Sequence, residues 1–86
     1  MSWNNQNSGQ PDREHPPFVE GERICFSTKQ DKGRKGVVVE CQWDYIPYLQ
    51  QKGWFVLVRL DDGETKRTMP KFIVKLRNVQ GVEVPA

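Results

Sequence analysis

Short apolar runs separated by glycine, aspartate and lysine clusters occupy the chain from residue 18 to residue 76. Runs of this length that are rich in Val, Ile and Phe are typical of β-strands. The pattern predicts strands at residues 23–27, 36–42, 54–60, 65–68 and 72–76. Because no segment repeats its apolar residues with the helical period of about 3.6 residues, the sequence predicts an all-β domain.

Two breaks separate the last three of these strands. Asp62 and Gly63 favour a tight hairpin turn after residue 60. Pro70 cannot donate a hydrogen bond to a ladder, which predicts a 3₁₀ turn before the last strand. Five short strands interrupted in this way predict a small SH3-like barrel, whose closure leaves few exposed strand edges.

Side-chain alternation assigns the buried face of each strand. On the third strand, the even-numbered residues from 54 to 60 are expected to face the core, while Phe55 and Leu57 face outward. The buried face of the first two strands is expected to contain Ile24, Phe26, Val37, Val39 and Cys41. The aromatic residues expected in the core are Phe18, Phe26, Trp54 and Phe72.

The two ends of the chain differ from the strand-rich middle. Residues 1–17 are rich in Asn, Gln, Ser, Gly and Pro, and they cannot bury enough apolar surface to offset the entropy cost of ordering. We therefore expect a disordered N-terminal tail over residues 1–17. The barrel is expected over residues 18–78, and residues 79–86 are expected to form a flexible C-terminus.

Residues 43–53 form a stretch that is long for a hairpin loop, and we expect it to lie outside the strands as an insertion. Within it, residues 47–52 predict a single helical turn that ends at Gly53. Three aromatic residues belong to it: Trp43, Tyr45 and Tyr48. These rings either seal an open end of the barrel as a lid or stay exposed as a recognition surface, and the sequence leaves both open.

The connection between the first two strands is basic. It carries four positive groups: Lys29, Lys32, Arg34 and Lys35. Gly33 and Gly36 are expected to supply the backbone freedom that a tight loop requires. The sequence therefore predicts a compact positive patch at the loop tip, which suits phosphate.

Residues 21–38 resemble the KOW motif of a family of large-subunit ribosomal proteins and of the NusG family of transcription factors. The matching features are an acidic residue after glycine, alternating apolar positions and a Lys/Gly-rich loop followed by valine: Gly21, Glu22, Ile24, Phe26, residues 31–36 and Val38. Lys29 departs from the pattern, since those families commonly have glycine there. The resemblance implies a KOW-type or Tudor-like barrel whose loop contacts RNA or a neighbouring protein in a large assembly.

Composition narrows the function further. The formal net charge of +2 permits contact with nucleic acid without demanding it. His15 is the one histidine and lies in the tail, and Cys25 and Cys41 have no CxxC spacing. We therefore expect no enzyme activity, no metal, no cofactor and no small-molecule substrate. No apolar run reaches about 18 residues, which predicts no membrane insertion and favours a cytoplasmic protein.

Two binding functions remain open. The first is docking onto RNA or a nucleoprotein assembly through the basic loop, and the second is a protein–protein adaptor, or a small peripheral or regulatory subunit of a larger complex, that uses the aromatic insertion. A second basic group near the last strands adds to either surface. The residues expected to bind a partner are Lys29, Lys32, Arg34, Lys35, Trp43, Tyr45, Tyr48, Lys66, Arg67 and Lys71.

Overall fold

The structure of the chain is a computed structural model that describes residues 13–86. Most of the expected tail, residues 1–12, therefore lies outside the described residues; residues 13–16 are exposed, and Phe18 is buried. From residue 13 onward the regular structure consists of strands and two short 3₁₀ turns. In chain order the elements are β1 (Arg23–Phe26), β2 (Lys35–Ile46), η1 (Pro47–Leu49), β3 (Gln51–Leu60), β4 (Thr65–Thr68), η2 (Pro70–Phe72), β5 (Ile73–Val79) and β6 (Val82–Pro85).

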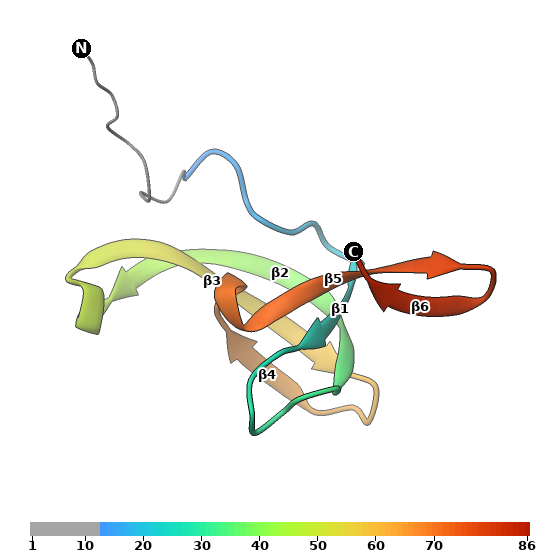
Figure 1. Cartoon of the computed structure of the whole chain (residues 1–86). Coiled ribbons are helices and arrows are strands. Elements are labelled where there is room, and N and C mark those ends of the chain that lie inside the picture. The colour runs from blue at the N-terminus through green and yellow to red at the C-terminus, as the bar shows by residue number, and fades with distance from the viewer. Residues whose placement is uncertain (1–12) are drawn as a thin grey trace, which may run out of the picture.

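The strands of the described chain form one curled antiparallel sheet in the order β4-β3-β2-β1-β5-β6 (Figure 1). The all-β class predicted from the apolar pattern is confirmed. The 3₁₀ turn expected at Pro70 is also confirmed, because η2 separates β4 from β5. The sheet has six strands in place of the five expected, since the C-terminal residues add β6.

The C-terminal residues form a hairpin, which corrects the expectation of a flexible end over residues 79–86. Val79 pairs with Val82 across a two-residue turn, and the turn residues Gln80 and Gly81 have φ values of 54° and 86°. Positive φ at both positions is the signature of the type I′ turn that short hairpins favour. The sequence Val-Gln-Gly-Val therefore carried a turn signal that the strand pattern alone did not reveal.

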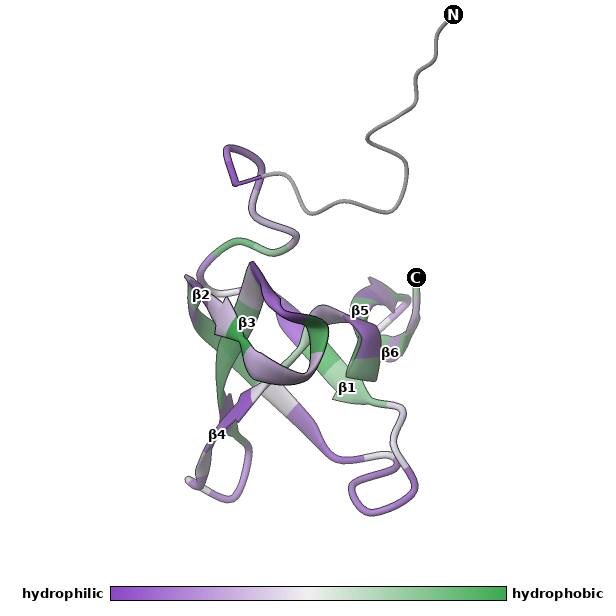
Figure 2. Ribbon diagram, turned by 90° about the vertical axis from the view of Figure 1, so that its left-hand side faces the viewer, coloured by the Kyte–Doolittle hydropathy of each residue, from purple (hydrophilic) through white to green (hydrophobic). Residues whose placement is uncertain are grey.

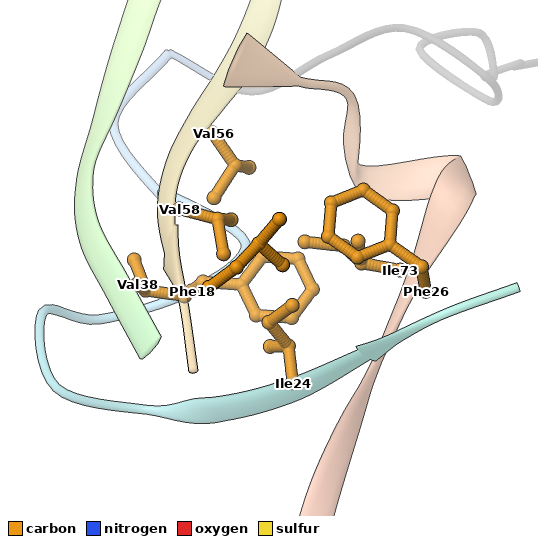
Figure 3. Packing of buried hydrophobic residues seen from close by; sticks show 8 residues of the cluster. Phe18, Ile24, Phe26, Val38, Val56, Val58 and Ile73 are labelled. Atoms are coloured by element: carbon orange, nitrogen blue, oxygen red, sulfur yellow. The ribbon is translucent and has the colours of Figure 1, made fainter. Parts of the chain in front are cut away.

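The core lies inside the curl of the sheet (Figure 3). Its buried cluster consists of Phe18, Ile24, Phe26, Val38, Val56, Val58, Leu60 and Ile73. Burial of each such side chain contributes about 1.5 to 3 kcal/mol relative to exposure, so this small cluster provides the main hydrophobic stabilisation. Trp54 and Phe72, which were expected in the core, are half-buried and stand outside the cluster.

A β-bulge in β2 changes which of its side chains face the core. The pairing of β2 with β3 shifts between Val38 and Glu40, so Val39 is an extra residue on this strand. Val38 is therefore buried, whereas Val37 and Val39 are half-buried, contrary to the expected alternation. Beyond the bulge the phase is shifted by one residue, and Cys41 packs against the core as expected.

The two glycines of the basic region have different physical roles. Gly33 has a φ of +84°, as a tight loop requires. Gly36 lies in β2, where a Cβ atom would be 2.6 Å from the carbonyl oxygen of Arg59 and 2.8 Å from a methyl group of Val58. The expectation of loop freedom is therefore wrong for Gly36, which is needed for the close approach of β2 to β3.

The expected insertion at residues 43–53 is a continuation of two strands. β2 and β3 stay paired as far as Ile46 and Gln51, whereas β4 pairs with β3 from Val56 to Arg59. The distal part of the hairpin thus projects from the sheet as a two-stranded arm, residues 43–54 (Figure 1). The 3₁₀ turn η1 closes the arm, and Gln50, with a φ of 54°, ends that turn in place of Gly53.

Candidate functional site

The basic loop between β1 and β2 is joined to the β3–β4 turn by the hydrogen bond from Arg34 to Asp62, and both loops are hydrophilic (Figure 2). Backbone hydrogen bonds fix its shape. The Gly33 N–H donates to the carbonyl of Phe26 at 3.2 Å, and the Arg34 N–H donates to the carbonyl of Asp31 at 2.9 Å. The loop is therefore closed on itself, with Arg34 at its inner end.

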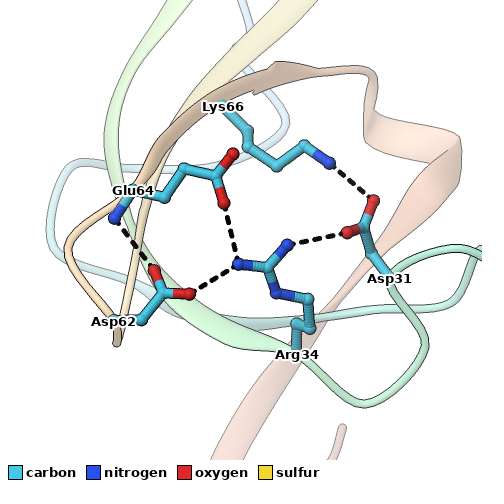
Figure 4. Close-up of polar contacts among 5 residues, drawn as sticks. All are labelled: Asp31, Arg34, Asp62, Glu64 and Lys66. Carbon is cyan, nitrogen blue, oxygen red and sulfur yellow. Dashed lines mark hydrogen bonds and ion pairs between the residues drawn. The ribbon is translucent and has the colours of Figure 1, made fainter.

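Arg34 is the centre of an ion-pair network that joins the two loops (Figure 4). Its Nη1 donates to Asp31 at 2.9 Å, and its Nη2 donates to Asp62 at 2.7 Å and to Glu64 at 2.9 Å. Lys66 of β4 donates to the second carboxylate oxygen of Asp31 at 2.7 Å. Two cations that were expected to bind a partner are thus engaged by the protein's own carboxylates.

Asp31 is the anchor of this network. It is 8% exposed, and a carboxylate with so little contact to water needs compensating donors. The hydrogen bonds from Lys66 and Arg34 lower the pKa of Asp31 below its ordinary value. The hydrogen bonds to Glu64 and Asp31 raise the pKa of Arg34 in turn, so the charged form of the guanidinium is favoured.

A second arginine joins the body of the sheet to the C-terminal hairpin. Arg23 donates to both oxygens of Asp61, at 2.7 and 3.0 Å, and to both oxygens of Glu83, at 2.7 and 3.1 Å. These hydrogen bonds lower the pKa values of Asp61 and Glu83. The acidic β3–β4 turn therefore serves to neutralise Arg23 and Arg34.

Of the basic residues expected to bind a partner, four form ion pairs: Arg34, Lys35, Lys66 and Arg67. The contact of Lys35 with Glu83 is the longest of these, at 3.7 Å. Within residues 13–86, Lys29, Lys32 and Lys71 have no carboxylate partner. The predicted positive patch on the basic loop is thereby reduced to two exposed lysines.

An open groove of about 560 Å³ lies where β4 ends and η2 begins. We call it the arm groove, and it is lined by Tyr48, Phe55, Arg67, Thr68, Met69, Lys71 and Phe72. The arm contributes Tyr48, and Phe55 comes from β3 next to the base of the arm. The turn at Pro70 takes the chain away from the β3 ladder after Thr68, which places Lys71 and Phe72 on the groove wall.

Rings and cations are interleaved in the arm groove. The guanidinium carbon of Arg67 is 3.9 Å from the centre of the Phe55 ring. The Lys71 ammonium is 5.6 Å from the centre of the Tyr48 ring and 5.2 Å from that of Phe72. These distances are within the range of cation–π attraction. The cations therefore lie against the rings.

The other two aromatic residues expected to bind a partner occupy different surroundings. Trp43 is half-buried and packs edge-on against Trp54 across the arm, with the ring centres 5.2 Å apart. Tyr45 is 51% exposed and does not line the groove. Tyr48 is 63% exposed, and its hydroxyl donates to the sulfur of Met69 at 2.9 Å.

Three of the residues expected to bind a partner line this groove: Tyr48, Arg67 and Lys71. Thr68, Met69 and Phe72 also line it and were not expected there, and Phe55 was expected only as an outward-facing apolar residue. Alternation along β3 did place Phe55 on the outer face. The break at Pro70 could have indicated that Phe72 lies outside the core. Where the chain leaves the ladder, strand alternation no longer determines the direction of its side chains. Met69 had no comparable signal.

Other reactive groups add little to this site. Cys25 and Cys41 are free thiols, and burial raises the pKa of Cys41, which disfavours its nucleophilic form. In the part of the chain from residue 13 onward, no group of three His, Cys, Asp or Glu side chains converges in a way that holds a metal ion. The same residues contain no helix long and apolar enough to cross a membrane.

Comparisons with protein-family models, with curated proteins and with solved structures each gave no match for this chain.

Proposed function

We propose that the chain is a non-catalytic docking module that binds a protein partner in the arm groove. The observation that carries this proposal is the groove itself, where the rings of Tyr48, Phe55 and Phe72 gather with Met69 around an open hollow. Aromatic residues and methionine are enriched at protein interfaces, and a few of them usually supply most of the binding energy.

The tip of the arm extends this surface. Tyr45 and Leu49 are 51% and 45% exposed, and they flank Tyr48 in the chain. Neighbouring exposed apolar side chains mark interaction sites more often than isolated ones do. The exposed apolar side chains of the arm tip therefore add a second candidate contact for an adaptor or for a small subunit, next to the arm groove.

The ion pairs support a protein partner over the RNA partner expected from the basic loop. Arg34 and Lys66 already hold carboxylates at 2.7 to 2.9 Å, and they would have to give up these contacts to bind phosphate. Nucleic-acid affinity comes largely from cations that meet successive phosphates. RNA docking at Lys29 and Lys32 stays a second candidate, because these two exposed lysines lack carboxylate partners among the described residues.

We further propose that β1 to β5 are an SH3-like unit of the KOW type. Three features support this: antiparallel pairing of consecutive strands from β1 to β4, the 3₁₀ turn before β5, and the Lys/Gly-rich loop with Gly33 in a left-handed conformation. A reducing cytoplasm suits the two free thiols. The arm groove is lined by aromatic rings and by cations that lie against them, and this surface suits binding without catalysis.

Site-directed photo-crosslinking in the native cell extract tests the proposed function. Benzoylphenylalanine in place of Tyr48 reports on the arm groove, and the same group in place of Lys32 reports on the basic loop. We expect a protein adduct at position 48 that survives ribonuclease. Adducts confined to position 32 and removed by ribonuclease would instead establish the RNA function.

A further inference from the structure

We propose that the segment bound in the arm groove is acidic: an extended peptide with one bulky apolar side chain flanked by carboxylates. This inference rests on the proposed docking function and names the chemistry of the partner. It follows from where the two groove cations lie, from how each is held and from the charges next to them.

The apolar part of the groove fits a single large side chain. Tyr48, Phe55 and Phe72 line a hollow of about 560 Å³, together with the thioether of Met69. A hollow of this size accepts one aromatic or branched aliphatic side chain of a peptide with room for its backbone. The partner therefore needs one apolar anchor rather than a broad apolar face.

Lys71 sets the sign of the charge that the groove accepts. It is exposed, it lies within cation–π distance of Tyr48 and Phe72, and it has no carboxylate partner within residues 13–86. A cationic ligand that approached the same rings would meet the Lys71 ammonium and be repelled. A carboxylate next to the anchor would instead be attracted, because it gives Lys71 the counter-charge it lacks.

Arg67 already shows how a carboxylate is held at this site. One oxygen of Asp44 accepts a hydrogen bond from Nη2 of Arg67 at 3.1 Å, while the other accepts the backbone N–H of Tyr45 at 2.7 Å. The Arg67 and Asp44 side chains are 44% and 60% exposed. Since guanidinium has five N–H donors, Arg67 can donate hydrogen bonds to a carboxylate of the partner, either beside Asp44 or in place of Asp44. Asp44 is therefore an internal competitor for the partner.

A nucleic-acid strand fits this surface less well than an acidic peptide. A strand needs cations along its whole track, and here two cations are confined to one groove. A peptide that has a few carboxylates near one apolar anchor needs cations only at the groove itself.

Nuclear magnetic resonance of the ¹⁵N-labelled full chain tests the inference with capped pentapeptides of matched length. The probes are Glu-Glu-Phe-Glu-Glu, Gln-Gln-Phe-Gln-Gln and Lys-Lys-Phe-Lys-Lys, with oligouridylate as the nucleic-acid probe. We expect the Glu peptide to shift the amide signals of Tyr48, Phe55 and Lys71. The affinity of the Glu peptide should be roughly fivefold higher than that of the Gln peptide, because the Glu peptide can form two exposed charge pairs with Arg67 and Lys71. The Lys peptide should bind more weakly than the Gln peptide.

Two variants separate a direct charge contact from general attraction. Asp44→Asn removes the competitor and should raise affinity for the Glu peptide, whereas Arg67→Gln should abolish most of its advantage over the Gln peptide. Arg77→Gln is the control, because Arg77 is exposed on β5 and forms no ion pair within the described chain. The spectra show directly whether each variant is folded.

Equal affinity for the Glu and Gln peptides, with shifts in the groove, would overturn the acidic preference and leave docking in the groove intact. Shifts caused by oligouridylate in place of the peptides would overturn both proposals. If no probe shifts the groove signals, the acidic segment is refuted, and photo-crosslinking at position 48 decides separately whether the groove binds a protein.

Discussion

The guanidinium of Arg67 stacks on the ring of Phe55, with 3.9 Å between the guanidinium carbon and the ring centre. The two residues come from neighbouring strands, on the face of β3 opposite to the core. The contact covers part of an outward-facing ring, and the ion pair with Asp44 holds the guanidinium from β2. Contacts from three strands thus hold the Arg67 and Phe55 side chains in place on the wall of the arm groove.

Removing this stacking should weaken the domain measurably. We expect Arg67→Ala to lower the free energy of unfolding by about 1 kcal/mol, the upper value for an exposed cation–π pair. Urea denaturation measures it. Arg77→Ala is the matched control and should change the free energy by less than about 0.5 kcal/mol. Equal losses in both variants would show that the stacking contributes nothing specific.

The two glycines near the basic loop should respond differently to the same substitution. Gly33→Asn should lower the free energy of unfolding by about 1 kcal/mol, because a φ of +84° strains a residue with a Cβ atom, although the surrounding space is open and asparagine adopts this conformation more readily than most residues. Gly36→Asn should cost about 2 kcal/mol, because its Cβ would overlap the Arg59 carbonyl. Thermal unfolding of the two variants checks the contrast, and the reverse order of stability would refute the proposed role of Gly36.

Acid should destabilise the fold through its ion pairs. Asp31, Asp61, Asp62 and Glu83 have pKa values lowered by hydrogen bonds in the folded state. A carboxyl group whose pKa is lower in the folded state stabilises the fold above its ordinary pKa, and that stabilisation is lost as the pH falls through the folded pKa. Stability should therefore be nearly constant from pH 7 to about 5 and should fall below about pH 4.

Asp31→Asn tests the share of one carboxyl group in this acid response. The variant should be less stable than the native chain at pH 7, and the difference should shrink as the pH falls toward 3. Glu20→Gln, an exposed substitution in the turn before β1, is the control. A difference that stays constant with pH would mean that Asp31 acts through packing rather than through its charge.

The C-terminal turn can be improved. Gln80 has a φ of 54°, which is unfavourable for glutamine and acceptable for asparagine. Because Asn-Gly is the preferred type I′ pair, Gln80→Asn should raise the free energy of unfolding by about 0.5 kcal/mol. Gln30→Asn, in the basic loop and outside the left-handed region, should not raise it. A destabilised Gln80→Asn chain would contradict the hairpin described for β5 and β6.

Local patterns predicted the parts of the fold that depend on local chemistry. The hairpin turn after β3, the break at Pro70 and the outward orientation of Phe55 each followed from residue type or from alternation. Val37 and Val39 were misassigned because the bulge adds one residue, and a bulge has no distinct signature in a run of three valines. The arm was missed because Trp43 and Tyr45 lie beyond the region where alternating polarity marks a buried face.

The candidate site depended on contacts that sequence patterns do not record. Positive charge was visible at Arg34, but two of the three carboxylates that neutralise it come from a turn about thirty residues later in the chain. The pairing of Arg67 with Asp44 likewise needs the register of three strands. Sequence reasoning therefore identified the right kinds of residue and overestimated the charge available to a phosphate.

We propose that the arm groove, and not the basic loop, holds the partner. Calorimetric titration of the protein recovered by crosslinking at position 48 tests it most directly, with two double variants compared against the native chain. Tyr48→Ala with Lys71→Ala should weaken binding at least about tenfold, as the loss of an aromatic hot spot does, and Lys29→Ala with Lys32→Ala should leave it within about twofold. A loss of affinity confined to the Lys29 and Lys32 variant would refute binding in the arm groove and would place the binding surface on the basic loop.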